Sequence, residues 1–259
     1  MRLLRPVIIA AALIGLWQAV VWATAVPFFI LPGPGRVLAM AVDRWDVLAM
    51  HAWVTAAEIV LGLAIGVVIG VASAIVIASF GAARAWVLPL LVVSQALPVF
   101  ALAPLLTLWF GYGMASKVAM AVLIIYFPVT AAFYDGLRRT DPVWLDLART
   151  MDATPAALLR HVRVPSALPA FSSGVRIAAS VAPIGAVVGE WVGSSRGLGY
   201  LMLHANGRMQ TDLMFAALIV LAGLALTVYF VIDHLLRRLV HWSPEAMPDP
   251  HLVNMGTRP

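Results

Sequence analysis

Residues 193–197 read Gly-Ser-Ser-Arg-Gly and match the Gly-x-Ser-x-Gly arrangement around the nucleophile of many serine hydrolases. Ser195 would then need a histidine base within hydrogen-bond reach and an acid to orient that base. His204 lies close in the sequence but has no obvious orienting acid, and His234 comes at the end of a later apolar stretch. Glycine and serine are also common in turns. We therefore predict no catalytic residues in this segment.

The chain lacks the residues for several other kinds of reactive site. It has no cysteine, which excludes disulfides, thiolate metal sites and cysteine nucleophiles. Its sole lysine is Lys117, in Ala-Ser-Lys-Val-Ala, and no glycine-rich loop precedes it. A phosphate-binding P-loop needs a lysine directly after such a loop. We therefore expect no cofactor and no metal ion on this chain, so that any ATP-driven activity needs a separate ATPase.

Polar side chains interrupt the apolar stretches at Glu58, Gln95 and Glu190, which are candidates for a substrate pathway. A charged or amide group inside a bilayer is costly, so it usually faces a partner or a water-filled path. Glu58 equally fits pairing with a neighbour, and Gln95 equally fits a hydrogen bond between helices. Glu190, beside Trp191, also fits an interfacial position. The two glutamates would begin the relay of an ion-coupled secondary transporter, which stays open as an alternative.

These residues are set in a very hydrophobic chain. Of its 259 residues, 63% are hydrophobic and 11% are charged, and the mean hydropathy is +0.96. Gly62, Gly66 and Gly70 recur at every fourth position, which predicts close packing of one helix on another. Runs of about 20 apolar residues recur, and each is long enough to cross a bilayer. We predict an all-α integral membrane protein of about six transmembrane helices, over residues 7–26, 54–79, 86–110, 117–136, 172–192 and 213–235.

The basic residues predict the orientation of these spans, because cytoplasmic segments are enriched in lysine and arginine. With the N-terminus inside, eleven basic residues lie on the inner side and five on the outer side. The inner ones are Arg2, Arg5, Arg84, Arg138, Arg139, Arg149, Arg160, Arg163, Arg237, Arg238 and Arg258, and the outer ones are Arg36, Arg44, Lys117, Arg196 and Arg208.

We therefore expect both termini in the cytoplasm. The first span is expected to be an uncleaved helix, although residues 1–25 also have the three parts of a secretory signal. Arg176 falls early in the fifth span, from which its side chain is expected to reach the cytoplasmic face. This orientation puts Ser195 and His234 on opposite sides of a hydrocarbon core about 30 Å thick, which further disfavours a hydrolase.

Segment 137–171 is a polar stretch between the fourth and fifth predicted spans, and it is expected in the cytoplasm. Its sequence has a pattern typical of short helices. Asp141 and Thr154 each precede a proline, and this pairing starts helices, because the polar side chain caps free N–H groups and proline fits the first turn. We predict two short helices joined by a tight turn at Asp152 and Ala153. Aspartate tolerates the left-handed conformation that such a turn needs.

The second short helix is expected over 156–162, after which Pro165 and Pro169 bring the chain back towards the membrane. A projection of this kind fits a solvated loop or a docking surface for another protein. DNA binding by the same helix–turn–helix is disfavoured, because the segment is short and tethered to membrane spans at both ends. We expect no nucleic-acid partner.

The segment resembles the cytoplasmic coupling motif of permease subunits from ATP-binding-cassette (ABC) importers, which reads Glu-Ala-Ala, three residues, Gly, nine residues, Ile, one residue, Leu-Pro. Asp146 takes the acidic position, Leu147 and Ala148 the alanines, Asp152 the glycine, Val162 the isoleucine and Val164-Pro165 the closing pair. The resemblance implies that an ATPase docks here. The candidate coupling residues are Asp146, Leu147, Ala148, Asp152, Ala153, Pro155, Val162 and Pro165.

The resemblance covers nearly the whole chain. "LPGPGRVLAMAV", "SQALPVFALAPLLTLWFGYG" and "SSRGLGYLMLHANGRMQTDLMFAALIV" are similar to the subfamily serving sulfonates, taurine, nitrate and thiamine-pyrimidine precursors. It implies the type I importer permease fold, as one transmembrane domain over 1–259. Within this domain we expect a first helix and external segment over 1–52, a core over 53–240 that contains the coupling loop 137–171, and a cytoplasmic tail over 241–259.

The resemblance also implies the partners and the place of the protein. They are a second copy of the permease, two cytoplasmic ATPase subunits that bind ATP and Mg²⁺, and a periplasmic or lipid-anchored substrate-binding protein, all at the lipid of a bacterial inner membrane. Related permeases often carry arginine where this chain has Glu58, so the local charge is reversed. This reversal favours a thiamine-pyrimidine precursor or a similar small organic solute, with sulfonate, taurine and nitrate as alternatives.

Overall fold

The computed structural model describes residues 4–242, and within that range its regular secondary structure is helical throughout. The predicted all-α class is therefore confirmed. In chain order the helices are α1 (Leu4–Thr24), α2 (Pro34–Asp43), α3 (Trp45–Ser79), α4 (Gly81–Ala96), α5 (Val99–Phe110), α6 (Met114–Arg138), α7 (Pro142–Thr150), α8 (Pro155–Leu158), the π-helical turn η1 (Leu159–Arg163), α9 (Val164–Gly193), α10 (Leu198–Gly207) and α11 (Thr211–Leu239).

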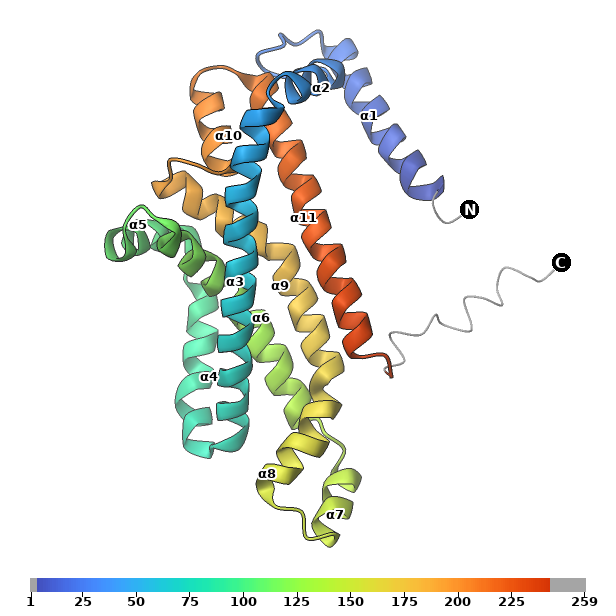
Figure 1. Ribbon diagram of the computed structural model, residues 1–259, viewed down its shortest axis with the longest axis vertical. Helices are drawn as coiled ribbons and strands as arrows, with labels where there is room; N and C mark the ends of the chain where they lie inside the picture. Colours follow the sequence, from blue (N-terminus) through green and yellow to red (C-terminus); the bar gives the residue numbers. More distant parts are fainter. Residues whose placement is uncertain (1–3, 243–259) are drawn as a thin grey trace, which may run out of the picture.

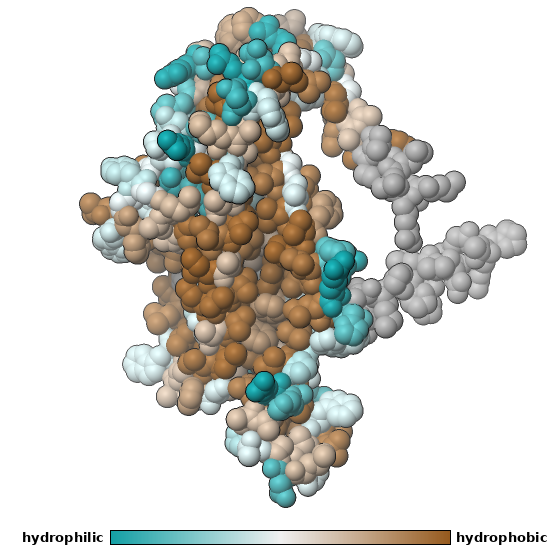
Figure 2. Space-filling view, in the orientation of Figure 1, coloured by the Kyte–Doolittle hydropathy of each residue, from teal (hydrophilic) through white to brown (hydrophobic). Residues whose placement is uncertain are grey.

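The long helices have the length and composition of membrane spans. Four stretches of the described chain qualify: α3, α6, α11, and the continuous run Pro155–Gly193 that ends in α9. Their apolar side chains form a band around the middle of the molecule, with hydrophilic residues gathered at its upper end and around the lower α7–α8 projection (Figure 2). This distribution is the one expected of a protein with a bilayer around its waist.

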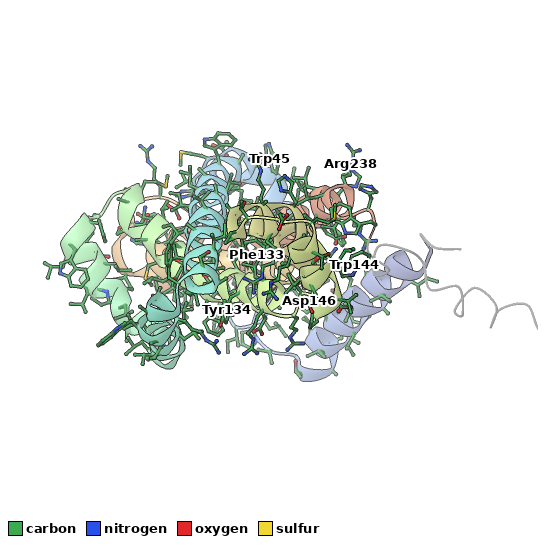
Figure 3. All side chains as sticks on the ribbon, turned by 90° about the horizontal axis from the view of Figure 1, so that it is seen from below. Trp45, Phe133, Tyr134, Trp144, Asp146 and Arg238 are labelled. Atoms are coloured by element: carbon green, nitrogen blue, oxygen red, sulfur yellow. The ribbon has the colours of Figure 1, made fainter. Side chains whose placement is uncertain are left out.

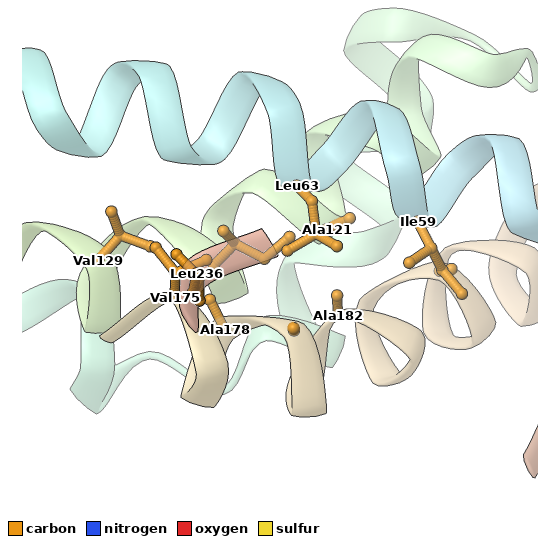
Figure 4. Packing of buried hydrophobic residues seen from close by; sticks show 11 residues of the cluster. Ile59, Leu63, Ala121, Val129, Val175, Ala178, Ala182 and Leu236 are labelled. Atoms are coloured by element: carbon orange, nitrogen blue, oxygen red, sulfur yellow. The ribbon is translucent and has the colours of Figure 1, made fainter. Parts of the chain in front are cut away.

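The core lies where α6 packs against α3 and α9 (Figure 1). Small residues let these helices approach closely: an added Cβ at Gly62 would lie 2.5 Å from Cβ of Ala121, and one at Gly66 would lie 2.6 Å from Cγ2 of Ile125. Gly70 meets Val129 in the same way, at 2.8 Å. The packing role predicted for the three glycines is confirmed. Figure 4 shows the cluster around them, which includes Ile59, Leu63, Ala121, Val129, Val175, Ala178, Ala182 and Leu236.

The third predicted span, 86–110, is not one helix. α4 ends at Ala96 and α5 begins at Val99, and the two lie at an angle to each other beside α3 (Figure 1). The break falls at Leu97 and Pro98, which are both extended, with ψ values of 120° and 114°. Proline lacks an N–H donor and disfavours a helical residue before it, so the helix ends there.

The start of α3 and two additional helices also differ from the prediction. α3 begins at Trp45, nine residues before the predicted start of the second span at 54. α2 and α10 form in segments that we expected to be outer loops. α1 stands apart from the bundle in Figure 1 and is joined to it through α2, although Trp17 stacks on Phe215 of α11 with ring centroids 5.8 Å apart. The predicted tail 241–259 lies outside the described residues except for its first two.

Pro165 and Pro169, which we expected to bring the chain back towards the membrane, lie where it returns, but they do not break the helix. α8 passes through η1 directly into α9, and both prolines lie inside this continuous helical run. A π-helical turn widens the backbone locally, which accommodates a proline whose ring would otherwise clash with the preceding turn. The expected helix over 156–162 is therefore the start of a long rod that ends at Gly193.

Candidate functional site

The loop between α6 and α9 folds into a compact projection below the apolar band (Figure 1). The carboxylate of Asp141 accepts a hydrogen bond from the amide of Val143 at 2.9 Å, at the start of α7. The hydroxyl of Thr154 accepts one from the amide of Ala157 at 3.2 Å, at the start of α8. Both predicted caps are confirmed.

The turn between α7 and α8 has the predicted left-handed residue. Asp152 has φ of +54°. Its amide donates to the carbonyl of Arg149 at 3.0 Å, and the amide of Ala153 donates to the carbonyl of Ala148 at 3.1 Å. These two bonds close the turn, so aspartate here takes the conformation for which the coupling motif uses glycine.

The outer face of α7 carries exposed apolar side chains. Val143, Leu147 and Met151 follow one another at four-residue spacing and are 70%, 51% and 75% exposed. Trp144, marked in Figure 3 with the molecule seen from this end, is 58% exposed beside them. Because the projection lies below the apolar band (Figures 1 and 2), a bilayer around that band would not cover this stripe. Contiguous apolar surface of this kind is typical of a protein–protein contact.

The candidate coupling residues fall into two groups. Those from Asp146 to Pro155 lie together in the projection, whereas Val162 lies in η1 and Pro165 in the first turn of α9. Asp146 forms an ion pair with Arg149 at 2.9 Å. A groove of about 290 Å³ separates α7 from α8. Exposed among the candidates are Asp146, Leu147, Asp152 and Pro155, and half-buried are Ala148, Ala153, Val162 and Pro165.

A buried polar cluster lies at the opposite end of the bundle, where the first turn of α10 meets α3 and α9. Glu190, on α9, is 1% exposed, so of the positions that the sequence left open it takes one enclosed by the protein. Its carboxylate accepts hydrogen bonds from the Thr55 hydroxyl at 2.6 Å and the Tyr200 amide at 3.3 Å, and another from the amide of Gly199. A carboxylate at the positive end of a helix dipole is stabilised there.

Side chains of α3 complete the cap of α10. The Thr55 hydroxyl accepts from the amide of Leu198 at 2.8 Å, and Nδ1 of His51 accepts from the amide of Gly197 at 2.9 Å. Together, His51, Thr55 and Glu190 accept hydrogen bonds from four successive amides that have no partner within the helix. These amides belong to Gly197, Leu198, Gly199 and Tyr200. Gly197 has φ of +115°, and a Cβ there would lie 2.2 Å from the Glu190 carboxyl carbon. Glycine is required for this close approach.

Glu58 lies one turn after Thr55 on the same face of α3 and is fully buried. Lys117 of α6, which we had assigned to an outer segment, is itself only 6% exposed, and its ammonium lies 3.3 Å from Oε1 of Glu58. Neither carboxylate oxygen accepts a geometrically regular hydrogen bond within the described part of the chain. The ion pair is therefore the interaction that compensates the burial of both charges.

Replacing Lys117 by methionine is expected to destabilise the protein by about 3–5 kcal/mol, because the Glu58 carboxylate would stay buried without a countercharge. The thermal unfolding of the purified chain in detergent measures this loss. The matched control is the double variant Lys117→Met with Glu58→Gln, which removes both charges of the pair and is expected to recover most of the stability. A single variant as stable as the wild type would contradict the role of the pair.

The structure brings Glu58 and Glu190 into one cluster, in which Glu190 accepts a hydrogen bond from Thr55 and Glu58 pairs with Lys117. The ion-coupled carrier therefore stays open as the alternative function. Gln95 lies near the end of α4, and its side chain is outside the described part of the structure. The guanidinium of Arg176 binds Asp233, near the lower end of α11, at 2.7 Å.

The suspected nucleophile segment forms a turn. The hydroxyl of Ser194 bonds to the backbone of Arg196, and Ser195 lies beside it, between α9 and α10. His204 lies on α10, where its ring packs 4.0 Å from that of Tyr200. His234 lies on the last turns of α11, near the opposite end of the bundle (Figure 1). The segment thus serves to lead the chain into the cap of α10.

Comparison with known proteins adds to this geometry. Residues 66–241 match the family of binding-protein-dependent transport system inner membrane components. The chain belongs to this family. A relative from Haemophilus influenzae, described as a probable ABC transporter permease protein, is 57% identical over 242 residues, which cover 93% of this chain and 98% of the relative.

Two other relatives of the permease carry more specific names. The formylaminopyrimidine transport permease ThiX of Halalkalibacterium halodurans is 37% identical, over 92% of this chain and 96% of its own. The riboflavin transport system permease RibX of Chloroflexus aurantiacus is 38% identical, over 88% of this chain and 85% of its own. A chain from a structure of the MetNI methionine ABC transporter in inward-facing conformations superposes with a TM-score of 0.66 at 19% identity, covering 76% of this chain and 97% of that one. The permease therefore has the type I importer fold.

Sequence reasoning missed His51, Thr55 and the burial of Lys117. For Lys117 a signal existed, because it and Glu58 are opposite charges near the same ends of two predicted spans, and such charges pair inside membranes. His51 lies before the predicted start of the second span at residue 54, and Thr55 is the second residue of that span. Their role depends on α10, a helix that the sequence did not indicate.

Proposed function

We propose that this permease forms, with a second copy of itself, the translocation pathway of an ATP-driven importer. The observation that carries the proposal is the apolar stripe of Val143, Leu147 and Met151 on a projection clear of the membrane band. A cytoplasmic ATPase is the occupant that the family relationship favours. An extracytoplasmic binding protein would deliver the solute to the end that carries α2 and α10.

ATP and Mg²⁺ belong to the proposed ATPase and not to this chain. The sole lysine, Lys117, is buried in its ion pair with Glu58 and is unavailable to a phosphate. Arginines of α4, α6, η1 and α11 gather towards the α7–α8 end, which favours that end as cytoplasmic and the bacterial inner membrane as the location. With this orientation both termini are expected on the cytoplasmic side.

The continuous rod from Pro155 to Gly193 supports a mechanical route between the two ends. At its lower end lies the projection, and near its upper end Glu190 holds the first turn of α10. Near the lower end the Asp233 carboxylate bridges Arg176 and Arg237, at 2.7 and 2.8 Å, and so fastens α11 to the rod. Movement of the projection on ATPase closure would thus be passed along one continuous helical run to α10.

The proposed solute is a flat, nitrogen-rich heterocycle of the thiamine-pyrimidine precursor class. Support comes from the relatives named for formylaminopyrimidine and riboflavin transport. The reversed charge at Glu58 no longer supports this choice, because Lys117 neutralises it. The fold accommodates other solutes equally, so the solute class must be tested separately from the importer.

Uptake by proteoliposomes tests the solute. The permease would be reconstituted with its ATPase and binding protein, and ATP-dependent uptake of radiolabelled formylaminopyrimidine, riboflavin and taurine would be compared. We expect uptake of formylaminopyrimidine, reduced by competition with a related pyrimidine and not by taurine. ATP-dependent uptake of taurine alone would assign the permease to sulfonates and would leave its role as an importer subunit intact.

A further inference from the structure

A small cavity at the lower edge of the apolar band is surrounded by arginines. It has a volume of about 150 Å³ and lies between the α3–α4 turn, the end of α6 and η1. Arg84 comes from the first turn of α4, Arg138 from the last residue of α6 and Arg163 from η1. These positions are far apart in the sequence, so the fold has gathered three cations around one hollow.

The three arginines are not neutralised by the protein. Within residues 4–242 none of them forms an ion pair, although six such pairs occur elsewhere in that range. The Nε atom of Arg163 is buried and has no hydrogen-bond partner there. A buried guanidinium donor without a partner is costly, and like charges around one cavity repel each other. Both costs disappear if an anion occupies the cavity.

The remaining lining favours a phosphate group. Gly81 brings the first turn of α4 to the cavity, and the amide groups of a helix N-terminus attract phosphate. Tyr134, marked in Figure 3, adds a phenol to the wall. Arginine is the side chain best suited to phosphate oxygens, because its planar fork donates two parallel hydrogen bonds. A hollow of this size is small for a whole organic solute, for which pockets of about 300–1,000 Å³ are usual.

The surroundings point to a lipid as the source of that phosphate. The lining also includes Ile77 and Ala78, from the last turn of α3, which is one of the helices long and apolar enough to cross a membrane. Above the cavity, Trp86 and Leu90 lie one turn apart on α4 and are 78% and 66% exposed. α4 thus presents exposed apolar surface next to the cavity, on the side of the helix turned away from Arg84.

We propose that this cavity, the arginine hollow, binds the phosphodiester headgroup of an anionic phospholipid. Basic pockets between membrane helices are suited to such headgroups. Arg163 also lines the groove between α7 and α8, so the bound lipid would brace the base of the projection. The inference is independent of the solute and of the ATPase, and its failure would leave the proposed function untouched.

Native mass spectrometry of the full-length chain tests the proposal. The delipidated protein in a neutral detergent would be titrated with dioleoyl phosphatidylglycerol, with dioleoyl phosphatidylcholine and with inorganic phosphate. We expect phosphatidylglycerol to bind at least about tenfold more tightly than either other ligand. Each of Arg84→Gln, Arg138→Gln and Arg163→Gln is expected to weaken it about fivefold, and the triple variant roughly 100-fold.

Arg139→Gln is the matched control, because Arg139 is the adjacent exposed arginine and does not line the hollow. It is expected to bind phosphatidylglycerol like the wild type. The single variants at exposed Arg84 and Arg138 keep the test valid if the triple variant does not fold. Equal binding by wild type and variants, equal binding of the two lipids, or phosphate binding as tight as that of phosphatidylglycerol would overturn the proposal.

Discussion

Leu147→Glu is expected to abolish solute uptake and leave the permease folded in the membrane. Leu147 lies at the centre of the apolar stripe on α7 and is 51% exposed, so the stability of the chain itself should change by no more than about 0.5 kcal/mol. At the proposed contact the new carboxylate would be desolvated without a partner. The expected cost of about 2 kcal/mol or more corresponds to roughly 30-fold weaker association with the ATPase.

The measurement is paired: ATP-dependent uptake by proteoliposomes, and thermal unfolding of the purified chain. Leu147→Met is the control, because it keeps the volume and the apolar character of the side chain and is expected to retain uptake. Normal uptake by the Leu147→Glu variant at normal expression would show that the ATPase does not dock on this stripe. A large loss of thermal stability would instead assign Leu147 to the fold.

Glu190→Ala is expected to destabilise the permease by about 3–6 kcal/mol, since three buried donors would lose their acceptor. These are the Thr55 hydroxyl and the amides of Gly199 and Tyr200. Because native proteins are stable by only about 5–15 kcal/mol, much of the variant should fail to accumulate in the membrane. The loss should be concentrated at α10, whose first turn would have no anion at its positive end.

Hydrogen exchange of the α10 amides, together with the unfolding temperature, checks this expectation. Glu190→Gln is the conservative control, because its amide oxygen still accepts hydrogen bonds from the α10 amides. It should lose less stability than the alanine variant. Unchanged exchange at Gly199 and Tyr200 in Glu190→Ala would show that the carboxylate does not hold the helix.

The parts of the fold that the sequence predicted are those with short-range causes. Asp141 and Thr154 cap helices through bonds to residues two or three positions away, and the turn at Asp152 depends on the φ of that residue alone. Gly62, Gly66 and Gly70 predicted a packing face, because glycine at every fourth position of a membrane helix lets another helix approach closely.

The parts that were missed depend on distant segments. Whether a proline breaks a helix, as Pro98 does, or lies within one, as Pro165 does, depends on how the neighbouring backbone accommodates the ring, and at Pro165 the π-helical turn η1 does so. The sequence left the position of Glu190 open because its partners at Gly199 and Thr55 come from α10 and α3. The arginine hollow is likewise invisible in the sequence, where its cations come from three separate segments, α4, α6 and η1.

Affinity purification of the tagged chain from gently solubilised membranes, with mass spectrometry of the bound proteins, decides whether the permease is an importer subunit. We predict a stoichiometric partner that carries a P-loop, and we predict that Leu147→Glu loses this partner while Leu147→Met retains it. A chain that purifies alone and still moves solute into liposomes without ATP would contradict the importer and favour Glu58 and Glu190 as ion-coupling residues.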